Sequence, residues 1–237
     1  MFGAAKSTLS EDIDILCDVY KHFGLGRLDT VTGAAGGVRY RPCIEREQAV
    51  SFLKGLCEEL QTPSRLLPGG FLYLSDILSM PDIVRQMGII IAGQFYDEAP
   101  DFVLTMETKG IPVALMAAQS MGVPLVIARR SSKVYEGSAV NINYVSGSAG
   151  HIETMSLSRR AVKEGQRCLI VDDFLKAGGT AKGMIDLMSE FAVEVVGTAL
   201  VMATAHAANR RISGEKALMI MDESEDGKLS IRPADWL

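Results

Sequence analysis

The stretch Cys168-Leu-Ile-Val-Asp-Asp-Phe-Leu-Lys-Ala-Gly-Gly-Thr180 decides the fold of this chain. Its apolar run 168–171 is typical of a strand buried in a parallel sheet. Asp172 and Asp173 follow at the carboxyl end of that strand, and a small-residue loop leads into a helix expected over 181–191. Ligands of open α/β sheets bind at such strand ends, and glycines at a helix N-terminus let a phosphate approach backbone N–H groups. The stretch therefore predicts a site for a phosphorylated sugar, with carboxylates suited to a sugar diol or a hydrated metal ion.

This pattern, an apolar strand, two acidic residues, two apolar residues and a small-residue loop ending in Thr, is specific. It resembles the phosphoribosyl pyrophosphate (PRPP) motif of type I phosphoribosyltransferases. The resemblance implies that the two carboxylates hold the ribose hydroxyls and that 177–180 cradle the 5′-phosphate. Phe174 and Lys176 stand where the family usually has a smaller aliphatic residue and Ser, Thr or Ala. The residues of this stretch expected to bind PRPP are Asp172, Asp173, Phe174, Lys176, Ala177, Gly178, Gly179 and Thr180.

Alternating strands and helices predict the rest of the sheet. A strand is expected over 102–106, a helix over 111–121 and a further strand over 123–128. The loop after the first of these strands can face the same ligand as Asp172, because both follow the carboxyl ends of parallel strands. The resemblance makes it a pyrophosphate loop formed by Thr108, Lys109 and Gly110. The predicted fold class is α/β, a type I phosphoribosyltransferase fold with a parallel sheet flanked by helices. Later strands are expected over 195–203, 217–221 and 228–232.

A long insertion, 129–167, separates these strands from the central one and is basic. It holds seven Lys or Arg and three Glu, a net charge of +4 in a chain whose net charge is −5. A basic segment beside a pyrophosphate site would concentrate a polyanion there. Its polar centre, 144–150, resembles the mobile loop that closes over PRPP.

The N-terminal segment predicts a helix followed by a hairpin. The helix begins near Ser7 and stops at 23–26, and two short strands, 28–31 and 38–41, flank a glycine-rich tip. This is the order of a recognition helix and its wing. The candidate DNA contacts are Lys6, Ser7, Thr8, Arg27, Arg39 and Arg41. Residues 1–42 carry five basic and five acidic side chains, so a small packing or dimerisation element is an equal alternative.

The domain organisation expected from these segments has three parts. Residues 1–42 form a partial winged-helix DNA-binding module, 43–70 a connecting helix and linker, and 71–237 a PRPP-binding domain. No apolar run approaches the roughly 18 residues of a membrane span, and no signal peptide is expected. The four cysteines lack metal-ligand spacing, so no metal site is predicted and reduced thiols indicate the cytoplasm.

Several segments narrow the resemblance. They are Gly33–Tyr40, Leu67–Leu78, Lys109–Pro112, Asn143–Ser148, Thr154–Leu157 and the PRPP motif. Together they look like the purine operon repressor family of Gram-positive bacteria. That resemblance implies a winged helix fused to a non-catalytic phosphoribosyltransferase domain, a homodimer, binding to the control regions of purine genes, and PRPP as the effector. It leaves open whether Mg²⁺ accompanies PRPP.

Two questions stay open at this point. The first helices of a winged helix would lie before Met1, so we expect the chain as given to bind DNA weakly. The PRPP motif is also compatible with an active purine or xanthine phosphoribosyltransferase, because both classes bind PRPP. The N-terminal helix and hairpin favour the regulator, since an enzyme has no evident need of them.

Overall fold

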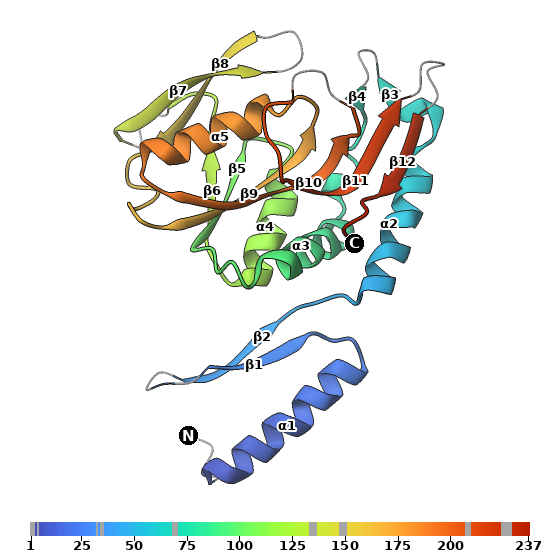
Figure 1. Ribbon diagram of the computed structural model, residues 1–237, viewed down its shortest axis with the longest axis vertical. Coiled ribbons are helices and arrows are strands. Elements are labelled where there is room, and N and C mark those ends of the chain that lie inside the picture. Colours follow the sequence, from blue (N-terminus) through green and yellow to red (C-terminus); the bar gives the residue numbers. More distant parts are fainter. Residues whose placement is uncertain are drawn as a thin grey trace.

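The computed structural model describes residues 3, 5–31, 33, 36–67, 71–132, 137–146, 151–206, 210–223 and 229–237. Figure 1 shows two units, a small N-terminal helix and hairpin and a larger α/β unit that holds the rest of the chain. We call the larger unit the effector domain.

A six-stranded sheet forms the centre of the effector domain, in the order β12-β11-β10-β9-β5-β6. Five strands are parallel, as expected, whereas β12 runs antiparallel to β11, so the sheet is mixed. The strands are β5 (Phe102–Met106), β6 (Leu125–Ala128), β9 (Arg167–Leu175), β10 (Glu194–Thr204), β11 (Lys216–Glu223) and β12 (Leu229–Pro233).

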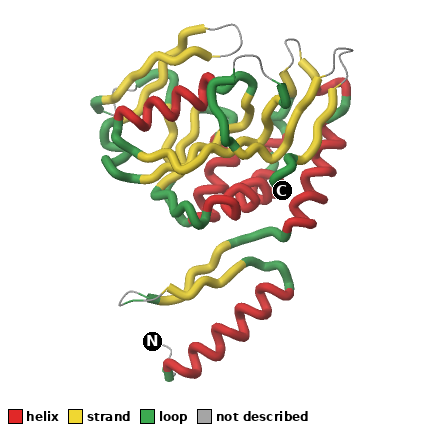
Figure 2. The backbone as a smooth tube through the Cα atoms, viewed as in Figure 1, coloured by secondary structure: helices red, strands yellow, loops and turns green. Residues whose placement is uncertain are grey.

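Helices cover both faces of this sheet (Figure 2). Alternate residues of the central strands face opposite sides, so Leu169 and Val171 pack with α3 and α4 while Cys168 and Ile170 pack with α5. These side chains are fully buried, which explains the continuous apolar run of the central strand. The helices are α2 (Arg46–Leu60), α3 (Pro81–Phe95), α4 (Ile111–Met121) and α5 (Gly179–Glu190).

The central strand is longer than the sequence predicts. β9 continues to Leu175, because β10 runs beside it and pairs Leu200 with Asp172 and Ala203 with Leu175. The two carboxylates therefore lie within the strand rather than after it. The following helix also begins earlier than expected, at Gly179.

A hairpin from the basic insertion lies over α5. It consists of β7 (Ala139–Ser146) and β8 (His151–Ser158), which pair along their whole length. Gly183 lets β7 come close, because a Cβ there would lie 2.9 Å from Cγ of Tyr144. The centre of the expected mobile loop, 147–150, lies outside the described residues, as do the insertion residues 133–136.

The helix and segment expected to connect the two units pack with the effector domain. Leu53 and Leu60 of α2 are fully buried and belong to the same core as Ile231 of β12. The short elements that follow are η1 (Pro63–Arg65), β3 (Leu66–Leu67), β4 (Phe71–Leu72) and η2 (Ile77–Ser79). Arg65 fixes them, since its guanidinium pairs with Asp76 at 2.8 Å and with Glu59 at 2.9 Å.

The N-terminal unit contains α1 (Lys6–His22) and a hairpin of β1 (Arg27–Val31) and β2 (Gly37–Arg41). One face of the hairpin packs on α1, where the rings of Tyr20 and Tyr40 meet edge to face at 5.5 Å. The helical spacing of the apolar residues predicts that Leu16 faces a core, but Leu16 is 46% exposed. None of the described helices is long and apolar enough to cross a membrane.

Candidate functional site

A cavity of about 460 Å³ opens at the carboxyl end of β9. It brings together all eight residues that the sequence assigns to the PRPP motif, together with Lys109 of the loop after β5. The other side of the cavity is apolar. The whole cavity is lined by Leu67, Leu72, Leu74, Lys109, Ser146, Asp172, Asp173, Phe174, Leu175, Lys176, Ala177, Gly178, Gly179, Thr180, Ala181 and Leu200.

The two carboxylates of β9 lie in an unfavourable electrostatic environment. Burial raises the pKa of Asp172 well above its usual range, and the negative charge of Asp173 raises it further. Burial also raises the pKa of Asp173, although the hydrogen bond with Asp172 and the charge of Lys109 oppose this rise. The backbone N–H of Asp173 donates to Oδ1 of Asp172 at 3.0 Å. A ligand that supplies hydroxyl donors or a cation would relieve this crowding of charge.

The loop after β5 packs directly on Asp172. A Cβ at Gly110 would lie 2.5 Å from Oδ1 of Asp172 and 2.6 Å from Oγ1 of Thr105, so only glycine fits there. Among the described residues, nothing hydrogen-bonds to the buried Oγ1 of Thr105. Thr108 and Lys109 of this loop are exposed, and the peptide bond before Thr108 is cis. The loop thus presents one cation next to the paired carboxylates.

The phosphate loop is held by hydrogen bonds from neighbouring backbone and side chains. Gly178 has φ +80°, a conformation that favours glycine, and it immediately precedes the N-terminus of α5. The carbonyl of Ala177 accepts a bond from the N–H of Arg211 at 2.9 Å, and that of Lys176 accepts one from the Thr204 hydroxyl at 3.2 Å. With these carbonyls bonded elsewhere, the N–H groups at the start of α5 have the placement that an anion would require.

A polar network that sequence reasoning missed borders the cavity. Glu153 of β8 accepts hydrogen bonds from the Tyr144 hydroxyl at 2.8 Å, from Ser146 at 3.0 Å and from Arg130 at 2.8 Å. The backbone N–H of Arg130 donates to Glu107 at 2.7 Å. The network thereby joins the loop after β5 to the β7–β8 hairpin.

The same network reaches the phosphate loop. The pKa of Tyr144 is raised to about 12, first by burial and then by the bond to Glu153, while a side-chain hydrogen bond with Thr180 opposes the rise. The bond from Tyr144 is the main cause of the lowered pKa of Glu153. Alternating polar residues in the insertion were a signal for this hairpin, but its register was not predictable from the sequence. The network therefore connects the loop after β5, the β7–β8 hairpin and the phosphate loop 177–180.

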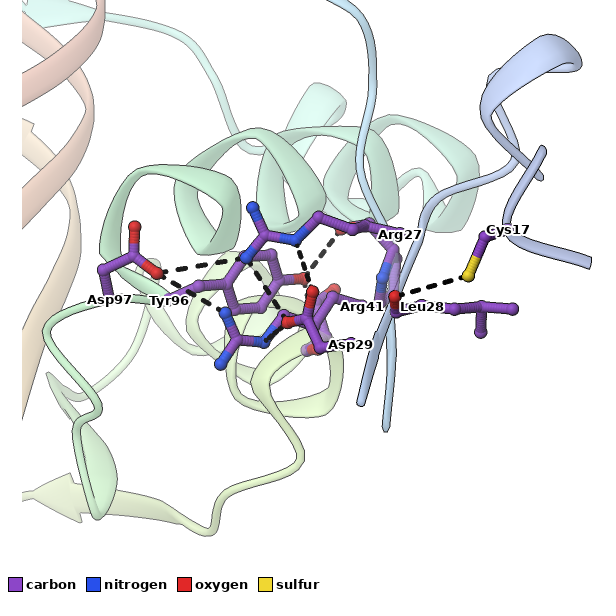
Figure 3. Close-up of polar contacts among 9 residues, drawn as sticks. Cys17, Arg27, Leu28, Asp29, Arg41, Tyr96 and Asp97 are labelled. Atoms are coloured by element: carbon purple, nitrogen blue, oxygen red, sulfur yellow. Dashed lines mark hydrogen bonds and ion pairs between the residues drawn. The ribbon is translucent and has the colours of Figure 1, made fainter. Parts of the chain in front are cut away.

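The predicted DNA contacts separate into two groups. Lys6 is the first residue of α1, Ser7 and Thr8 are exposed in its first turn, and Arg39 is exposed on β2. In Figure 1 the start of α1, the end of β1 and the start of β2 lie at the same end of the N-terminal unit. Arg27 and Arg41 lie at the opposite end, where Asp29 and Asp97 pair with their guanidinium groups (Figure 3).

Within the described part of the chain, no three His, Cys, Asp or Glu side chains come together in a group that could hold a metal ion. Asp172 and Asp173 supply two carboxylates, and oxygen ligands of this kind suit Mg²⁺ when phosphates complete its coordination. A divalent cation therefore fits here only together with a phosphorylated ligand.

Comparisons with protein families cover both units. Residues 74–225 match the phosphoribosyl transferase domain family, and residues 1–42 match the family described as bacterial purine repressor, N-terminal. The chain is 46% identical to the purine biosynthesis transcriptional repressor PurR of Bacillus subtilis, over 90% of this chain and 75% of that protein. It is 40% identical to the purine biosynthesis transcriptional activator PurR of Lactococcus lactis, over 97% of this chain and 85% of that protein.

More distant similarity extends to enzymes. A xanthine phosphoribosyltransferase of Geobacillus thermodenitrificans is 30% identical over 75% of this chain and 94% of that protein. Among solved structures, adenine phosphoribosyltransferase from Saccharomyces cerevisiae matches with a TM-score of 0.60 at 17% identity, over 70% of this chain and 97% of that chain. At that identity the match shows the fold alone.

Proposed function

Because the chain belongs to the family of bacterial purine biosynthesis transcriptional regulators, we propose that it is a PRPP-sensing repressor of purine biosynthesis genes. The observation that carries this proposal is the combination of a PRPP-motif cavity with an N-terminal helix and hairpin in one chain. One unit would read DNA and the other would report the concentration of a purine precursor. Repression is favoured over activation by the higher identity to the repressor of Bacillus subtilis.

The effector is bound by groups of matching chemistry. Asp172 and Asp173 accept hydrogen bonds from the ribose hydroxyls, and the same two carboxylates would hold Mg²⁺ if it accompanies PRPP, where the cation would neutralise phosphate charge. The phosphate loop 177–180 holds the 5′-phosphate against the N-terminus of α5. Lys109, within 108–110, pairs with the pyrophosphate, and Phe174 and Lys176 complete the wall of the cavity.

DNA is contacted by the exposed end of the N-terminal unit. The first turn of α1, with Lys6, Ser7 and Thr8, enters the major groove, and Arg39 of the wing contacts a phosphate. The protein acts as a homodimer in the cytoplasm, as the family resemblance implies. Its DNA affinity falls steeply with salt, since phosphate contacts release counterions.

The second candidate is an active purine or xanthine phosphoribosyltransferase. It is favoured by the 30% identity to a xanthine phosphoribosyltransferase and by the apolar side of the cavity, which could accept a base. We expect no transfer of the phosphoribosyl group, because the relatives with the highest identity are regulators. The N-terminal unit gives no advantage to an enzyme.

Two assays on one sample test the proposal. Calorimetry with PRPP, with and without Mg²⁺, should show saturable binding, and DNA bound to the chain should be released as PRPP is added. Incubation with PRPP and xanthine, hypoxanthine, guanine or adenine should give no nucleotide. Steady formation of any nucleotide would replace the regulator by the enzyme. PRPP binding that leaves bound DNA unaffected would remove PRPP as the effector.

A further inference from the structure

The N-terminal unit meets the effector domain through a small cluster, which we call the joint. It consists of Arg27, Asp29, Arg41, Tyr96 and Asp97, and Figure 3 shows these side chains turned toward one another. Nε of Arg41 lies 3.0 Å from Oδ2 of Asp29, and its Nη1 lies 3.6 Å from Oδ1 of Asp97. Nη2 of Arg27 lies 3.9 Å from the same oxygen of Asp97. Charges from the hairpin thus meet a carboxylate at the end of α3.

Tyr96 is the firmest contact in the joint. Its hydroxyl donates to the carbonyl of Pro42 at 2.7 Å, where the chain leaves the hairpin, and the carbonyl of Ser120 lies 3.3 Å away. Burial raises the pKa of Tyr96, in agreement with a hydroxyl that keeps its proton. The guanidinium of Arg41 lies over the Tyr96 ring, 4.9 Å from its centroid. One residue of the effector domain therefore holds both the last strand of the hairpin and the residue that follows it.

The alternation of the hairpin explains why these groups meet. Leu28 and Tyr40 are opposite one another on the face toward α1, so their neighbours Arg27 and Arg41 point to the other face. That face is directed at the effector domain. A groove of about 750 Å³ lies beside the joint, between the wing and the start of β5 and β6. Beside the joint, open space therefore separates the hairpin from the effector domain.

We propose that Arg41 and Tyr96 are positioning residues for DNA binding, which fix the wing relative to the effector domain and do not themselves touch DNA. This inference rests on the proposed function. Only 17% of the Arg41 side chain is exposed, and a DNA phosphate would have to displace two carboxylates to reach it. Arg39, two residues away on the same strand, is exposed, and its cross-strand neighbour Asp29 forms ion pairs with Arg27 and Arg41. The two arginines of β2 therefore have different roles.

The salt dependence of DNA binding separates these roles. The slope of log K against log salt concentration is negative, and each phosphate contact that is lost reduces its magnitude by about 0.9. Arg39→Ala, the matched control from the same strand, should reduce the magnitude by that amount. Arg41→Ala and Tyr96→Ala should instead weaken binding at every salt concentration by roughly fivefold or more, the lower end of typical coupling, with the slope unchanged. Tyr96→Phe keeps the ring below the guanidinium and should retain part of the affinity.

The affinities are measured by fluorescence anisotropy of a labelled duplex from the control region of a purine biosynthesis operon, at four salt concentrations. The double variant Arg41→Ala/Tyr96→Ala should bind no worse than the weaker single variant, because both changes open one joint. PRPP should still bind to all variants, since neither Arg41 nor Tyr96 lines the cavity. A slope reduced by about 0.9 in Arg41→Ala would overturn the inference and make Arg41 a phosphate contact.

The thiol of Cys43 gives a readout that does not need DNA. Cys43 follows Pro42 and is half-buried, and burial raises the pKa of its thiol. In a Cys17→Ser background, maleimide should label Cys43 slowly in the otherwise unchanged chain and faster in Tyr96→Ala. An unchanged labelling rate would reject the joint even if DNA binding fell. Absence of DNA binding by the unmodified chain would reject the proposed function, while faster labelling of Tyr96→Ala would still support the joint.

Discussion

Replacing Asp172 by Asn should weaken PRPP binding and, at the same time, stabilise the unliganded chain. The side chain of Asp172 is only 6% exposed, and both its burial and the charge of Asp173 oppose ionisation. Asn keeps the shape and the Oδ1 acceptor that receives the Asp173 N–H at 3.0 Å, but it removes one of two adjacent charges. The variant therefore tests whether the folded chain retains an unfavourable carboxylate because the ligand requires it.

The magnitudes follow from these contacts. A hydrogen bond to a charged acceptor contributes about 1.5–3 kcal/mol and one to a neutral acceptor about 0.5–1.5 kcal/mol, so the ribose loses roughly 1–1.5 kcal/mol. That loss corresponds to about 5- to 12-fold weaker binding. For a chain of this size, each kcal/mol of relieved repulsion should raise Tm by about 2–4 °C. Affinity and stability should thus change in opposite directions.

The pH dependence has a defined sign. A carboxyl group whose folded pKa is raised binds its proton more tightly in the folded state, so stability falls as pH rises from the ordinary Asp value, 3.8, through the raised value. The Asn side chain does not titrate, so Asp172→Asn should not show this fall in stability. Its Tm should exceed that of the unmodified chain most at pH above the raised value. PRPP affinity of the unmodified chain should rise over the same interval, because the ionised carboxylates are the better acceptors.

Calorimetry with PRPP and thermal melts at several pH values measure both effects, with exposed Asp82→Asn as the control for the lost charge. The control should leave PRPP affinity unchanged and should lower Tm slightly, because Asp82 lies in the first turn of α3, where its charge contributes about 0.3–1 kcal/mol. A lower Tm for Asp172→Asn at neutral pH would refute the argument that the carboxylate is unfavourable in the folded chain. PRPP affinity within twofold of the unmodified chain would remove Asp172 from the site.

Three further changes test the surroundings of the cavity. Tyr144→Phe removes the 2.8 Å bond to Glu153, so PRPP should bind roughly 2- to 12-fold more weakly in calorimetry, whereas Tyr73→Phe, at an exposed position, should not change binding. Gly179→Ala places a Cβ 2.0 Å from the carbonyl oxygen of Val145 and should lower the free energy of unfolding by about 1–3 kcal/mol in thermal melts. The control Gly55→Ala, with open space around it on α2, should raise the free energy of unfolding by about 0.5–1 kcal/mol. Arg65→Ala should lower Tm more at neutral pH than in acid below the lowered pKa of Asp76, because the pair with Asp76 stabilises the fold only while Asp76 is ionised, whereas the bond from Arg65 to the Tyr73 carbonyl does not titrate; an equal loss at both pH values would contradict it.

The elements predicted best are those whose ends are marked by local chemistry. β5 and α4 have the predicted bounds, because apolar runs end there at charged residues or glycine. The C-terminal part of β9 was not predictable, since Asp172 and Asp173 are poor strand formers and only pairing with β10 extends the strand through them. The direction of β12 also depends on its partner strand rather than on its own residues.

The residues of the candidate site also divide into those that local sequence predicts and those that depend on distant segments. The PRPP motif is local in sequence, so its residues were predictable together. The network at Glu153 depends on the register of β7 and β8, which places Tyr144 directly opposite it. The wing arginines show the same dependence on distant residues. The alternation of side chains along the hairpin was visible in the sequence. Asp97, which pairs with Arg27 and Arg41, comes from a segment more than fifty residues further along the chain.

The distance between the cavity and the joint limits how PRPP can affect DNA binding. PRPP can shift the wing only if it binds more tightly to one arrangement of the joint than to the other. The loop ending at Gly110 leads directly into α4, and α4 packs closely on α3, where a Cβ at Gly88 would lie 2.5 Å from Cβ of Met116. Tyr96 follows the end of α3. A shift of the loop after β5 would therefore move two tightly packed helices together, and the wing would follow through Tyr96. Reciprocity then requires bound DNA to lower PRPP affinity by the same factor by which PRPP lowers DNA affinity.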